Sequence, residues 1–400
     1  ALPAGDVIPA GERWHGVPAR KIGTPHAQSA REPDMAPWRH GVGLIALRAL
    51  HEFVIALPFT ALVVTMLGQL SMEGDEALQA LFLAVESPAT VLLLLGLMAL
   101  ALPSSLLTRA LWLRWTPKVP DGNHGRYTSM YWRIWLRTGH LEAAGNWMAG
   151  SLYWRWWLKL AGLRLGANGE ISTIIDVLPE NVSIGEQTFF ADGIYVAGPR
   201  VCRGVVTTAA TSLGKNTFLG NHAVIPAGVH MPDDILLGVC TVADDRKMPT
   251  GTSWFGHPVF QLPRREVVSM DRALTHDPEW WRYLNRLAWE TLRFALPLVG
   301  VAIGLWWLAA ATRAVADQRM GLELLANLSA LSLSAGAVAV GLVLVAKWAL
   351  IGRVRPGTHG LWSSWCCRWD FVYVAWDKVG RGPLSQLSGT LWLSMVLRAI

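Results

Sequence analysis

The stretch LGKNTFLGNHAVIPAGVHMPDDILLG, residues 213–238, repeats every six residues. An apolar side chain occupies each sixth position and a glycine or proline follows it, at Leu213, Leu219, Ile225, Met231 and Leu237. An α-helix repeats near 3.6 residues and a single strand near two, so neither explains this spacing. A fixed hexapeptide period is typical of the parallel β-helix, whose short strands stack around one apolar core. We therefore expect these five side chains to point into the interior of such a coil.

The same spacing extends toward the N-terminus. Two further series are six apart, Leu165–Ile171–Val177 and Ile184–Phe190–Val196, with one inserted residue between them. Three strands make one turn of the solenoid, so the hexads predict about four coils. Residues 198–210 break the register and are predicted to loop out, and loops on a rigid scaffold often carry function.

Four uncharged segments are each long enough to cross a membrane as a helix. They are residues 53–70, 87–107, 294–311 and 324–346. The composition agrees, because 52% of the residues are hydrophobic, only 16% are charged, and there are 22 Trp, a residue enriched at membrane interfaces. The sequence therefore predicts two transmembrane hairpins with the hexapeptide segment between them.

The charges flanking these segments predict their orientation. The turn of the first hairpin carries only acids, at Glu73, Asp75, Glu76 and Glu86. Lysine and arginine lie on the opposite flanks of both hairpins, which the positive-inside rule places in the cytoplasm. The net charge of +6 belongs largely to these flanks, which disfavours nucleic-acid binding. We expect a multi-pass protein of the bacterial inner (cytoplasmic) membrane with cytoplasmic β-helix domains.

Two internal repeats define the domain order. Residues 8–22 match residues 248–262, both reading hydrophobic-Pro-x-Gly-x-x-Trp-x-Gly-x-Pro, and residues 120–133 match 356–368. The repeating unit is a hairpin, a Trp-rich lead-in and a β-helix. The predicted order is a last coil of a preceding β-helix at 1–25, a linker at 26–52, hairpin 53–107, lead-in 108–162, β-helix 163–265, linker 266–293, hairpin 294–346, and at 347–400 a lead-in to a further β-helix.

The Trp-rich lead-ins combine aromatic rings with cations, as in YWRWWLKLAGLRLG at 153–166. This mixture is typical of a helix lying at the headgroup level of a membrane. The four cysteines show no CxxC or other ligand spacing and favour a reducing compartment.

The chain resembles the C-terminal membrane region of non-ribosomal peptide synthetases of the poly-lysine synthetase type, in which tandem hexapeptide-repeat domains alternate with transmembrane helix pairs. The residues that carry the match are FLGNHAVIPAG (218–228), LLGVCT (236–241) and GTSWFGHPVFQLPRR (251–265). The resemblance covers essentially the whole chain. It implies a mixed membrane protein, with a left-handed parallel β-helix between two transmembrane α-helical hairpins and Trp-rich interfacial helices.

The resemblance also implies an activity. Such synthetases carry adenylation and carrier domains upstream, and the membrane region forms an amide bond between a carrier-bound aminoacyl thioester and an amine. The implied cofactor is phosphopantetheine on the carrier domain. The implied partners are those upstream domains in the same polypeptide, membrane lipid, and an amino-acid or acyl substrate.

Aminolysis of a thioester needs a base for the amine and donors for the oxyanion. His222, after Asn221 at a coil corner, is the candidate catalytic base, in line with hexapeptide acyltransferases, or it forms a structural hydrogen bond there. His230 lies little more than one hexad further on, on the equivalent face. Its imidazole is expected to be oriented by Asp233 and Asp234.

Residues in and near the irregular stretch are candidates for substrate binding. Asp192 is predicted to hold the ammonium of an acceptor, and Arg200 and Arg203 to meet a phosphopantetheine phosphate. The alternative is a solvated loop. Cys202 lacks an activating base in the sequence and is a poor candidate nucleophile.

Two His–Arg pairs recur with the same spacing, His124 with Arg133 and His359 with Arg368. Recurrence in two units fits a shared way of docking the lead-in helix, and it fits catalysis as well. We assign the four residues a structural or docking role.

Two rival functions remain open, a CoA-dependent acyltransferase on the same fold and a non-catalytic membrane scaffold for neighbouring domains. An adenylation domain and a carrier serine motif upstream would favour the synthetase. The sequence shows no metal-ligand spacing and no phosphate-binding glycine loop, so neither a metal nor a bound nucleotide is expected.

Overall fold

The computed structural model describes residues 2, 5–16, 18–24, 32–69, 88–263, 270–317 and 321–399. The predicted acidic turn of the first hairpin lies outside these residues. The chain divides into two compact units, one built from Ala1–Ile55 and Leu106–Val268 and the other from Ala56–Ser105 and Ser269–Ile400. Each unit is described by itself.

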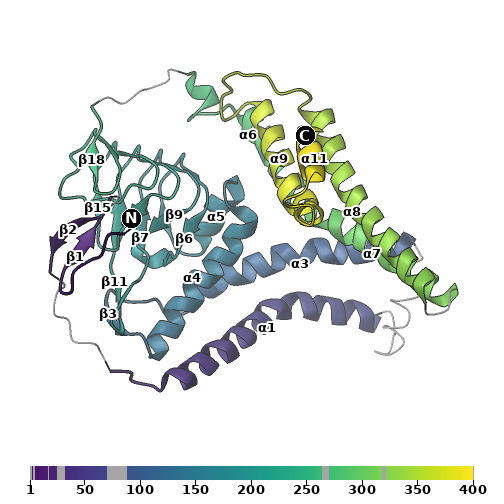
Figure 1. Cartoon of the computed structure of the whole chain (residues 1–400), viewed down its shortest axis with the longest axis horizontal. Helices are drawn as coiled ribbons and strands as arrows, with labels where there is room; N and C mark the ends of the chain where they lie inside the picture. The colour runs from purple at the N-terminus through teal and green to yellow at the C-terminus, as the bar shows by residue number, and fades with distance from the viewer. Residues whose placement is uncertain are drawn as a thin grey trace. The chain divides into compact units, whose positions relative to one another are not determined.

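In the first unit the chain visits three parallel sheets in turn, so that its strands stack as rungs (Figure 1). The first sheet holds β4 (Arg164–Leu165), β7 (Val182–Ile184), β12 (Thr211–Leu213) and β15 (His230–Met231). The second holds β5 (Glu170–Ile171), β8 (Phe189–Phe190), β13 (Phe218–Leu219), β16 (Leu236–Leu237) and β17 (Ser253–Phe255), then the antiparallel β18 (Phe260–Gln261). The third holds β6 (Ile174–Ile175), β9 (Ile194–Val196) and β14 (Val224–Ile225). We call the segment from β4 to β18 the coil.

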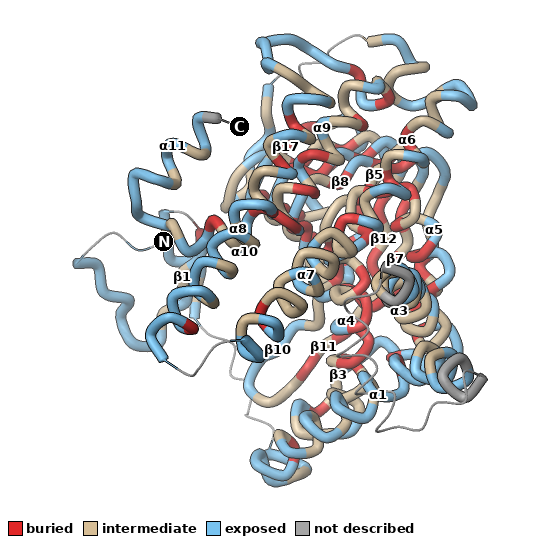
Figure 2. Tube along the Cα trace, turned by 90° about the vertical axis from the view of Figure 1, so that its right-hand side faces the viewer, coloured by how far each residue is buried: buried red, intermediate tan, exposed pale blue. Residues whose placement is uncertain are grey.

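The hexapeptide ladder lines the interior of the coil, as expected. Leu219, Ile225 and Leu237 are fully buried, and Leu213 and Met231 are each only 4% exposed. Leu213 pairs with Ile184 and Met231 in the first sheet, and the other ladder residues stack likewise in theirs. Figure 2 shows buried segments running through these strands. Burying each such side chain stabilises the fold by about 1.5–3 kcal/mol.

One ladder position differs from the expectation. Val177 is buried, but the third strand of the first turn is β6, which pairs Ile174 with Ile194. Asp176, with φ of 56°, turns the chain directly after this strand, and a 3-10 helix, η1 (Pro179–Asn181), follows. Val177 therefore lies beyond the rung, because the one-residue insertion before Ile184 is absorbed by η1.

Residues 198–210 loop out of the coil as predicted, and they form an ordered hairpin. Strand β10 (Arg200–Cys202) pairs antiparallel with β11 (Val205–Thr208). Strand β11 in turn pairs with β3 (Gly122–Gly125), which precedes the lead-in helices. The loop thus joins the coil to the segment that leaves the first helical hairpin. At the N-terminus, β1 (Arg13–His15) pairs antiparallel with β2 (Arg20–Gly23), as β17 does with β18.

The helices of the first hairpin, α1 (Pro37–Gln69) and α3 (Pro88–Trp115), extend beyond the predicted spans at residues 53–107. Polar residues at the ends of the apolar segments do not interrupt the backbone hydrogen bonds, so both helices continue beyond those segments. The lead-in forms α4 (Ser129–Met148) and α5 (Leu152–Leu160). Two of its tryptophans are buried in protein, with Trp154 Nε1 donating to the carbonyl of Ser172 and Trp157 Nε1 to that of Leu106. The lead-in therefore docks the coil with part of its aromatic face.

A buried ion pair connects three parts of this unit. The side chains of Arg137 on α4 and Glu180 on η1 are 1% and 5% exposed, and Nε lies 2.8 Å from Oε1. The guanidinium also donates to the carbonyl of Leu113 and to Thr116 Oγ1, at the end of α3. Glu180 Oε1 accepts from the backbone N–H of Val119 as well. The end of α3, the lead-in helix α4 and the coil therefore meet at this ion pair.

The second unit repeats the local features of the first. It contains η2 (Arg272–Leu274), α6 (Trp280–Arg293), α7 (Leu296–Asp317), α8 (Leu322–Leu350), α9 (Ser364–Ala375), a π-helical segment η3 (Trp376–Gly380), α10 (Arg381–Ser385) and α11 (Leu391–Ala399). Thr128 caps α4 by accepting from the N–H of Tyr131, and Ser363 caps α9 in the same way from Cys366. The two capping residues, Thr128 and Ser363, are 235 residues apart in the chain. The same distance separates Trp115 and Leu350, where the preceding helices α3 and α8 end.

Four segments are long and apolar enough to cross a membrane by length and composition: Pro37–Thr65, Val91–Trp115, Trp280–Asp317 and Leu322–Leu350. Each of them overlaps one of the four segments predicted from the sequence, and the last two contain theirs completely. The protein thus combines a hexapeptide coil with membrane-capable helices.

The Arg137→Met variant tests the buried pair. It leaves the Glu180 carboxylate buried without its cation, so we expect the free energy of unfolding in detergent to fall by about 3–5 kcal/mol. Lys215→Met is the control, because Lys215 and Glu186 form an exposed pair at 3.4 Å whose loss costs about 1 kcal/mol or less. A cost for Arg137→Met no larger than the control would contradict this role.

Candidate functional site

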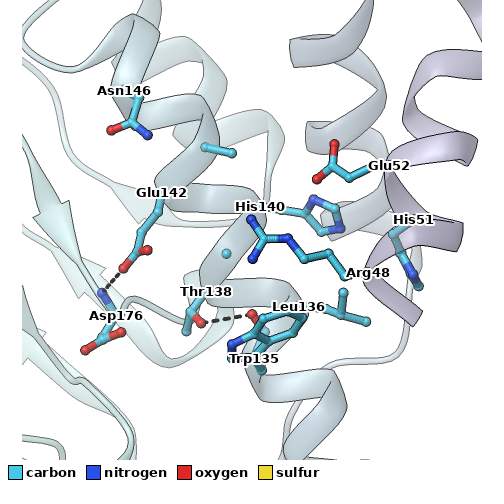
Figure 3. A pocket seen from close by; sticks show the side chains of 12 residues that line it. Arg48, His51, Glu52, Trp135, Leu136, Thr138, His140, Glu142, Asn146 and Asp176 are labelled. Atoms are coloured by element: carbon cyan, nitrogen blue, oxygen red, sulfur yellow. Dashed lines mark hydrogen bonds between the residues drawn. The ribbon is translucent and has the colours of Figure 1, made fainter. Parts of the chain in front are cut away.

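A cavity of about 270 Å³ lies in the first unit, between the polar part of α1, helix α4 and the coil residue Asp176 (Figure 3). Its lining is rich in ionisable and polar side chains: Arg48, His51, Glu52, Trp135, Leu136, Thr138, Gly139, His140, Glu142, Ala143, Asn146 and Asp176. We call it the α1–α4 cavity.

Helical spacing explains why these side chains converge. Arg48, His51 and Glu52 are three and four residues apart, so they share one face of α1. On α4, Trp135, Gly139, Glu142 and Asn146 follow the same spacing and share one face, and their neighbours Leu136, Thr138, His140 and Ala143 flank that face. Ionisable residues this close to an apolar membrane segment are costly unless paired, and they often mark a functional site.

Arg109 on α3 orders one wall of the cavity. Its NH2 group lies 2.6 Å from Glu52 Oε2, and its NH1 group lies 2.9 Å from His140 Nδ1. An arginine can only donate, so Nδ1 of His140 accepts and the proton of the neutral ring lies on Nε2. Nε2 is buried and has no hydrogen-bond partner among the described residues. In this state the ring keeps one buried N–H whose hydrogen-bonding capacity is unused.

Burial keeps His140 neutral. The residue is 3% exposed, and burial, then the positive charge of Arg109, lowers the pKa of its imidazole to about 3. The ring also contacts Trp112, with centroids 4.6 Å apart. At neutral pH it therefore acts as an uncharged hydrogen-bond donor.

Opposite charges line the two sides of the cavity. Glu142 Oε1 accepts from the backbone N–H of Asp176 at 3.3 Å, which holds both carboxylates at the coil side. Arg48 lies over the ring of Trp135, 5.4 Å from its centroid. Figure 3 shows Arg48 extending into the space between Glu142 and Asp176 on one side and His51 and Glu52 on the other. The arrangement suits a small ligand that carries both an ammonium and a carboxylate.

His222, the predicted base, occupies a turn position of the coil. Its φ is 57°, and Gly193 and Cys240 hold the equivalent corners with φ of 70° and 56°. Its backbone N–H donates to the carbonyl of Asp192, and Asn221 Oδ1 accepts from the N–H of Asp192. The imidazole is exposed and lies close against Gly193, where a side chain would clash with Nδ1. This geometry fits the structural alternative, a corner residue that tolerates a left-handed backbone.

His230 does not share a corner with His222. It lies on β15, and its Nδ1 is 2.8 Å from Ser212 Oγ on the neighbouring strand. The expectation that Asp233 and Asp234 orient this imidazole is wrong, because they bond Lys215 N and Asn216 Nδ2 at the next corner. Carboxylates at a turn bond the coil beneath them before they reach a neighbouring strand.

The predicted substrate residues lie on two different elements. Asp192 belongs to the corner row of His222, where its carboxylate accepts from Ser172 Oγ. Arg200 lies on β10 and Arg203 at the tip of the β10–β11 hairpin, both exposed. The structure does not bring the three together as one site.

The recurring His–Arg pairs occupy docking positions. His124 Nε2 lies 3.0 Å from the carbonyl of Pro120 and 3.1 Å from Thr208 Oγ1 on β11. Arg133 donates to the carbonyl of Lys118, and Arg368 donates to that of Leu350 at the end of α8. His359 stacks on Trp365, with centroids 4.0 Å apart.

The sequence did contain a signal for the α1–α4 cavity. Arg48 and Arg109 are among the cations that flank the first hairpin, and His140 and Glu142 lie in the lead-in that follows it. His51, Glu52 and Arg109 flank both apolar runs of one hairpin, and antiparallel helices bring such ends together.

The acid sensitivity of folding tests the neutral state of His140. Its lowered pKa means that the unfolded state binds a proton below pH 6.5 while the folded state does not. The site therefore contributes full stability above pH 6.5 and loses about 2 kcal/mol between pH 7 and pH 5. We expect His140→Gln to flatten the unfolding free energy over this range by that amount. His222→Asn, at an exposed corner, should keep the wild-type slope, and an equal slope in both variants would contradict the assignment.

Comparisons with known proteins follow this geometry. No family model matches the chain. The chain is 29% identical over 416 aligned positions to the delta-poly-L-ornithine synthetase of Acinetobacter baumannii (strain AB307-0294), covering 98% of this chain and 30% of that protein. Among solved structures, a maltose O-acetyltransferase from Clostridium difficile 630 is 13% identical with a TM-score of 0.26, covering 40% of this chain and 97% of its own. A galactoside acetyltransferase in complex with coenzyme A is 19% identical with a TM-score of 0.28, covering 40% and 92%. Over nearly its whole length, this chain is similar to a protein named as a poly-amino-acid synthetase, in agreement with the family resemblance of its sequence.

Proposed function

We propose that the chain is the membrane-embedded terminal region of a non-ribosomal peptide synthetase that joins a cationic amino acid into a polymer through amide bonds. The observation that carries the proposal is the similarity of 98% of the chain to a protein named as a poly-ornithine synthetase. The chain spans about 30% of that relative's length. The adenylation and carrier domains, with the phosphopantetheine arm, are accordingly assigned to an upstream part of the same polypeptide.

The proposed architecture is a left-handed parallel β-helix facing the cytoplasm of a bacterial inner membrane. Strands of two or three residues, a hexapeptide interior and one turn residue per corner support the β-helix. The left-handed sense comes from the family resemblance, and the cytoplasmic placement comes from the Lys and Arg residues that flank the hairpins.

We assign the acceptor amino acid to the α1–α4 cavity. Its volume of about 270 Å³ suits a small amino acid. Glu52 is paired with Arg109, and the other two carboxylates of the lining, Glu142 and Asp176, suit a side-chain or terminal ammonium. Arg48 suits the acceptor's carboxylate. A diamino acid such as ornithine satisfies both ends at once.

The reaction then needs a proton acceptor and a donor to the carbonyl. The amine loses a proton to Glu142 and attacks the thioester carbon; the C–N bond forms, the C–S bond breaks, and the proton passes to the leaving thiolate. We assign the donor to the Nε2–H of His140, whose lack of a hydrogen-bond partner among the described residues supports this role, and the carbonyl oxygen on which negative charge develops would accept from it. A neutral imidazole does this without repelling the ammonium of the substrate.

The scaffold and CoA-dependent alternatives assign no task to this cavity. A scaffold needs no carboxylates aimed at a small cavity beside α1. An acyltransferase built on His222 needs that imidazole to serve as a base, whereas its positive φ and its place among Gly193 and Cys240 are those of a corner residue. The α1–α4 cavity is therefore the better-supported site.

The test uses the full-length synthetase in detergent with ATP and ornithine, and follows polymer formation by mass spectrometry. We expect Glu142→Gln to raise the KM for the amino acid acceptor by about 10-fold or more, because a hydrogen bond to a charged group is lost, and to lower kcat by about 100-fold, because the proton acceptor is lost. Adenylation of ornithine, measured separately by pyrophosphate exchange, should be unchanged. His222→Asn is the matched control and should keep the wild-type rate.

Two results would count against the proposal. Polymer formation at an unchanged KM in Glu142→Gln would remove the cavity as the acceptor site. Loss of polymer in His222→Asn, with adenylation intact, would return the base to the coil corner.

A further inference from the structure

A second cavity in the first unit lies where the chain leaves α3. It encloses about 630 Å³ and is lined by Lys118, Val119, Pro120, Asp121, Met130, Arg133, Arg164, Glu180, Asn181 and Ala210. We call it the basal cavity. It plays no part in the amide-forming reaction proposed above, and it shares no lining residue with the α1–α4 cavity.

The charge of the basal cavity is positive. Its two acids are already engaged: Glu180 is paired with Arg137 behind the wall, and Asp121 accepts a hydrogen bond from Asn181 at 2.9 Å. Lys118, Arg133 and Arg164 form no ion pair within the described part of the chain; Arg133 bonds only the carbonyl of Lys118, at 3.4 Å. Glu180 is neutralised by Arg137, so three cations and the single carboxylate of Asp121 leave the lining of this cavity with a net positive charge.

The cavity lies at the membrane-proximal end of the coil. Helix α3, one of the four membrane-capable segments, ends at Trp115, which is 76% exposed. Lys118 follows three residues later, and Arg133 lies in the second turn of α4. Exposed tryptophan at the end of a spanning helix marks the headgroup region of a bilayer. Cations immediately beyond it meet phosphate groups at that depth.

The two helix-exit cations recur in the second unit. Helix α8 ends at Leu350, Arg353 follows three residues later, and Arg368 lies at the same position of α9 as Arg133 does of α4. The second unit carries the pair beside its own aromatic residues, Trp348 and Trp365. A positive pair kept at both helix exits favours a ligand that both exits meet, which is the bilayer itself.

We propose that the basal cavity binds the phosphate of an anionic phospholipid headgroup, held by Lys118, Arg133 and Arg164. Arginine presents paired N–H donors that match phosphate oxygens, and lysine adds a point charge. The volume of about 630 Å³ accommodates a headgroup such as phosphatidylglycerol, with its acyl chains lying along α3. A bound lipid of this kind fixes the height of the coil above the membrane surface. The same phosphate chemistry could be supplied by a soluble phosphopantetheine, and the test separates these sources.

The experiment titrates the full-length protein in zwitterionic detergent with short-chain phosphatidylglycerol and counts bound lipid by native mass spectrometry. Phosphatidylcholine of equal chain length serves as the neutral lipid, and coenzyme A and inorganic phosphate as soluble phosphates. We expect phosphatidylglycerol to bind most tightly. The double variant Lys118→Gln/Arg133→Gln should weaken it about 30-fold, at roughly 1 kcal/mol per cation near the membrane surface.

Two further variants are needed: a control double variant outside the cavity and a single variant on the coil side of the cavity. Lys215→Gln/Arg246→Gln removes two exposed cations from the coil surface and should leave lipid affinity within twofold of wild type. Arg164→Gln alters only the coil wall of the cavity and should weaken binding about fivefold without lowering the melting temperature. Equal affinity for both lipids, or equal affinity in the cavity and control variants, would overturn the proposal. Binding of coenzyme A in place of phosphatidylglycerol would overturn its lipid form. Because polymer formation is not measured, these outcomes are independent of the synthetase assignment.

Discussion

The first unit depends on one buried ion pair, Arg137 with Glu180. Two charges withdrawn from water cost several kcal/mol each, and the cost is offset only when every polar atom around them finds a partner. Here the partners are the carbonyl of Leu113, the hydroxyl of Thr116 and the N–H of Val119. These groups belong to the end of α3, so the pair can be satisfied only when helix, lead-in and coil are together. The coil is thereby fixed to the helix that emerges beside it.

Both cavities take their shape from that junction. Helix α4 carries Arg137 near its middle, the face from Trp135 to Asn146 toward α1, and Arg133 toward the exit of α3. A rotation of α4 would separate Glu142 from Asp176 and Arg133 from Lys118 together. The pair therefore positions the α1–α4 cavity on one side of the helix and the basal cavity on another, although it lines only the second, through Glu180.

The fold was largely predictable because its signals are periodic. The six-residue spacing of residues such as Leu219 and Ile225 predicts the interior of the coil, because this spacing is local in the chain. The length of the uncharged segments predicts the helices that can span a membrane. The site was not predictable in the same way. His140 is a neutral donor because tertiary packing buries its ring and because Arg109, 31 residues away in sequence, reaches its Nδ1. His222 drew attention as an imidazole at a corner, but its left-handed backbone shows why that residue suits the turn. Chemistry in this chain arises from contacts between helices, and a six-residue period carries no information about those.

The two units have diverged since they were duplicated. At a constant displacement of 235 residues, Arg109 corresponds to Leu344, Arg137 to Val372 and His140 to Ala375, so the second copy has aliphatic residues where the first has its polar centre. The π-helical segment Trp376–Gly380 follows directly, and the next cap, Thr390, lies 239 residues after Ser151. The extra residues widen one turn of the helix where the first copy runs unbroken. The two units thus match in their caps and helix ends and differ in the polar groups between them, so a ligand that needed both Arg109 and His140 would meet only aliphatic side chains at the matching positions of the second unit.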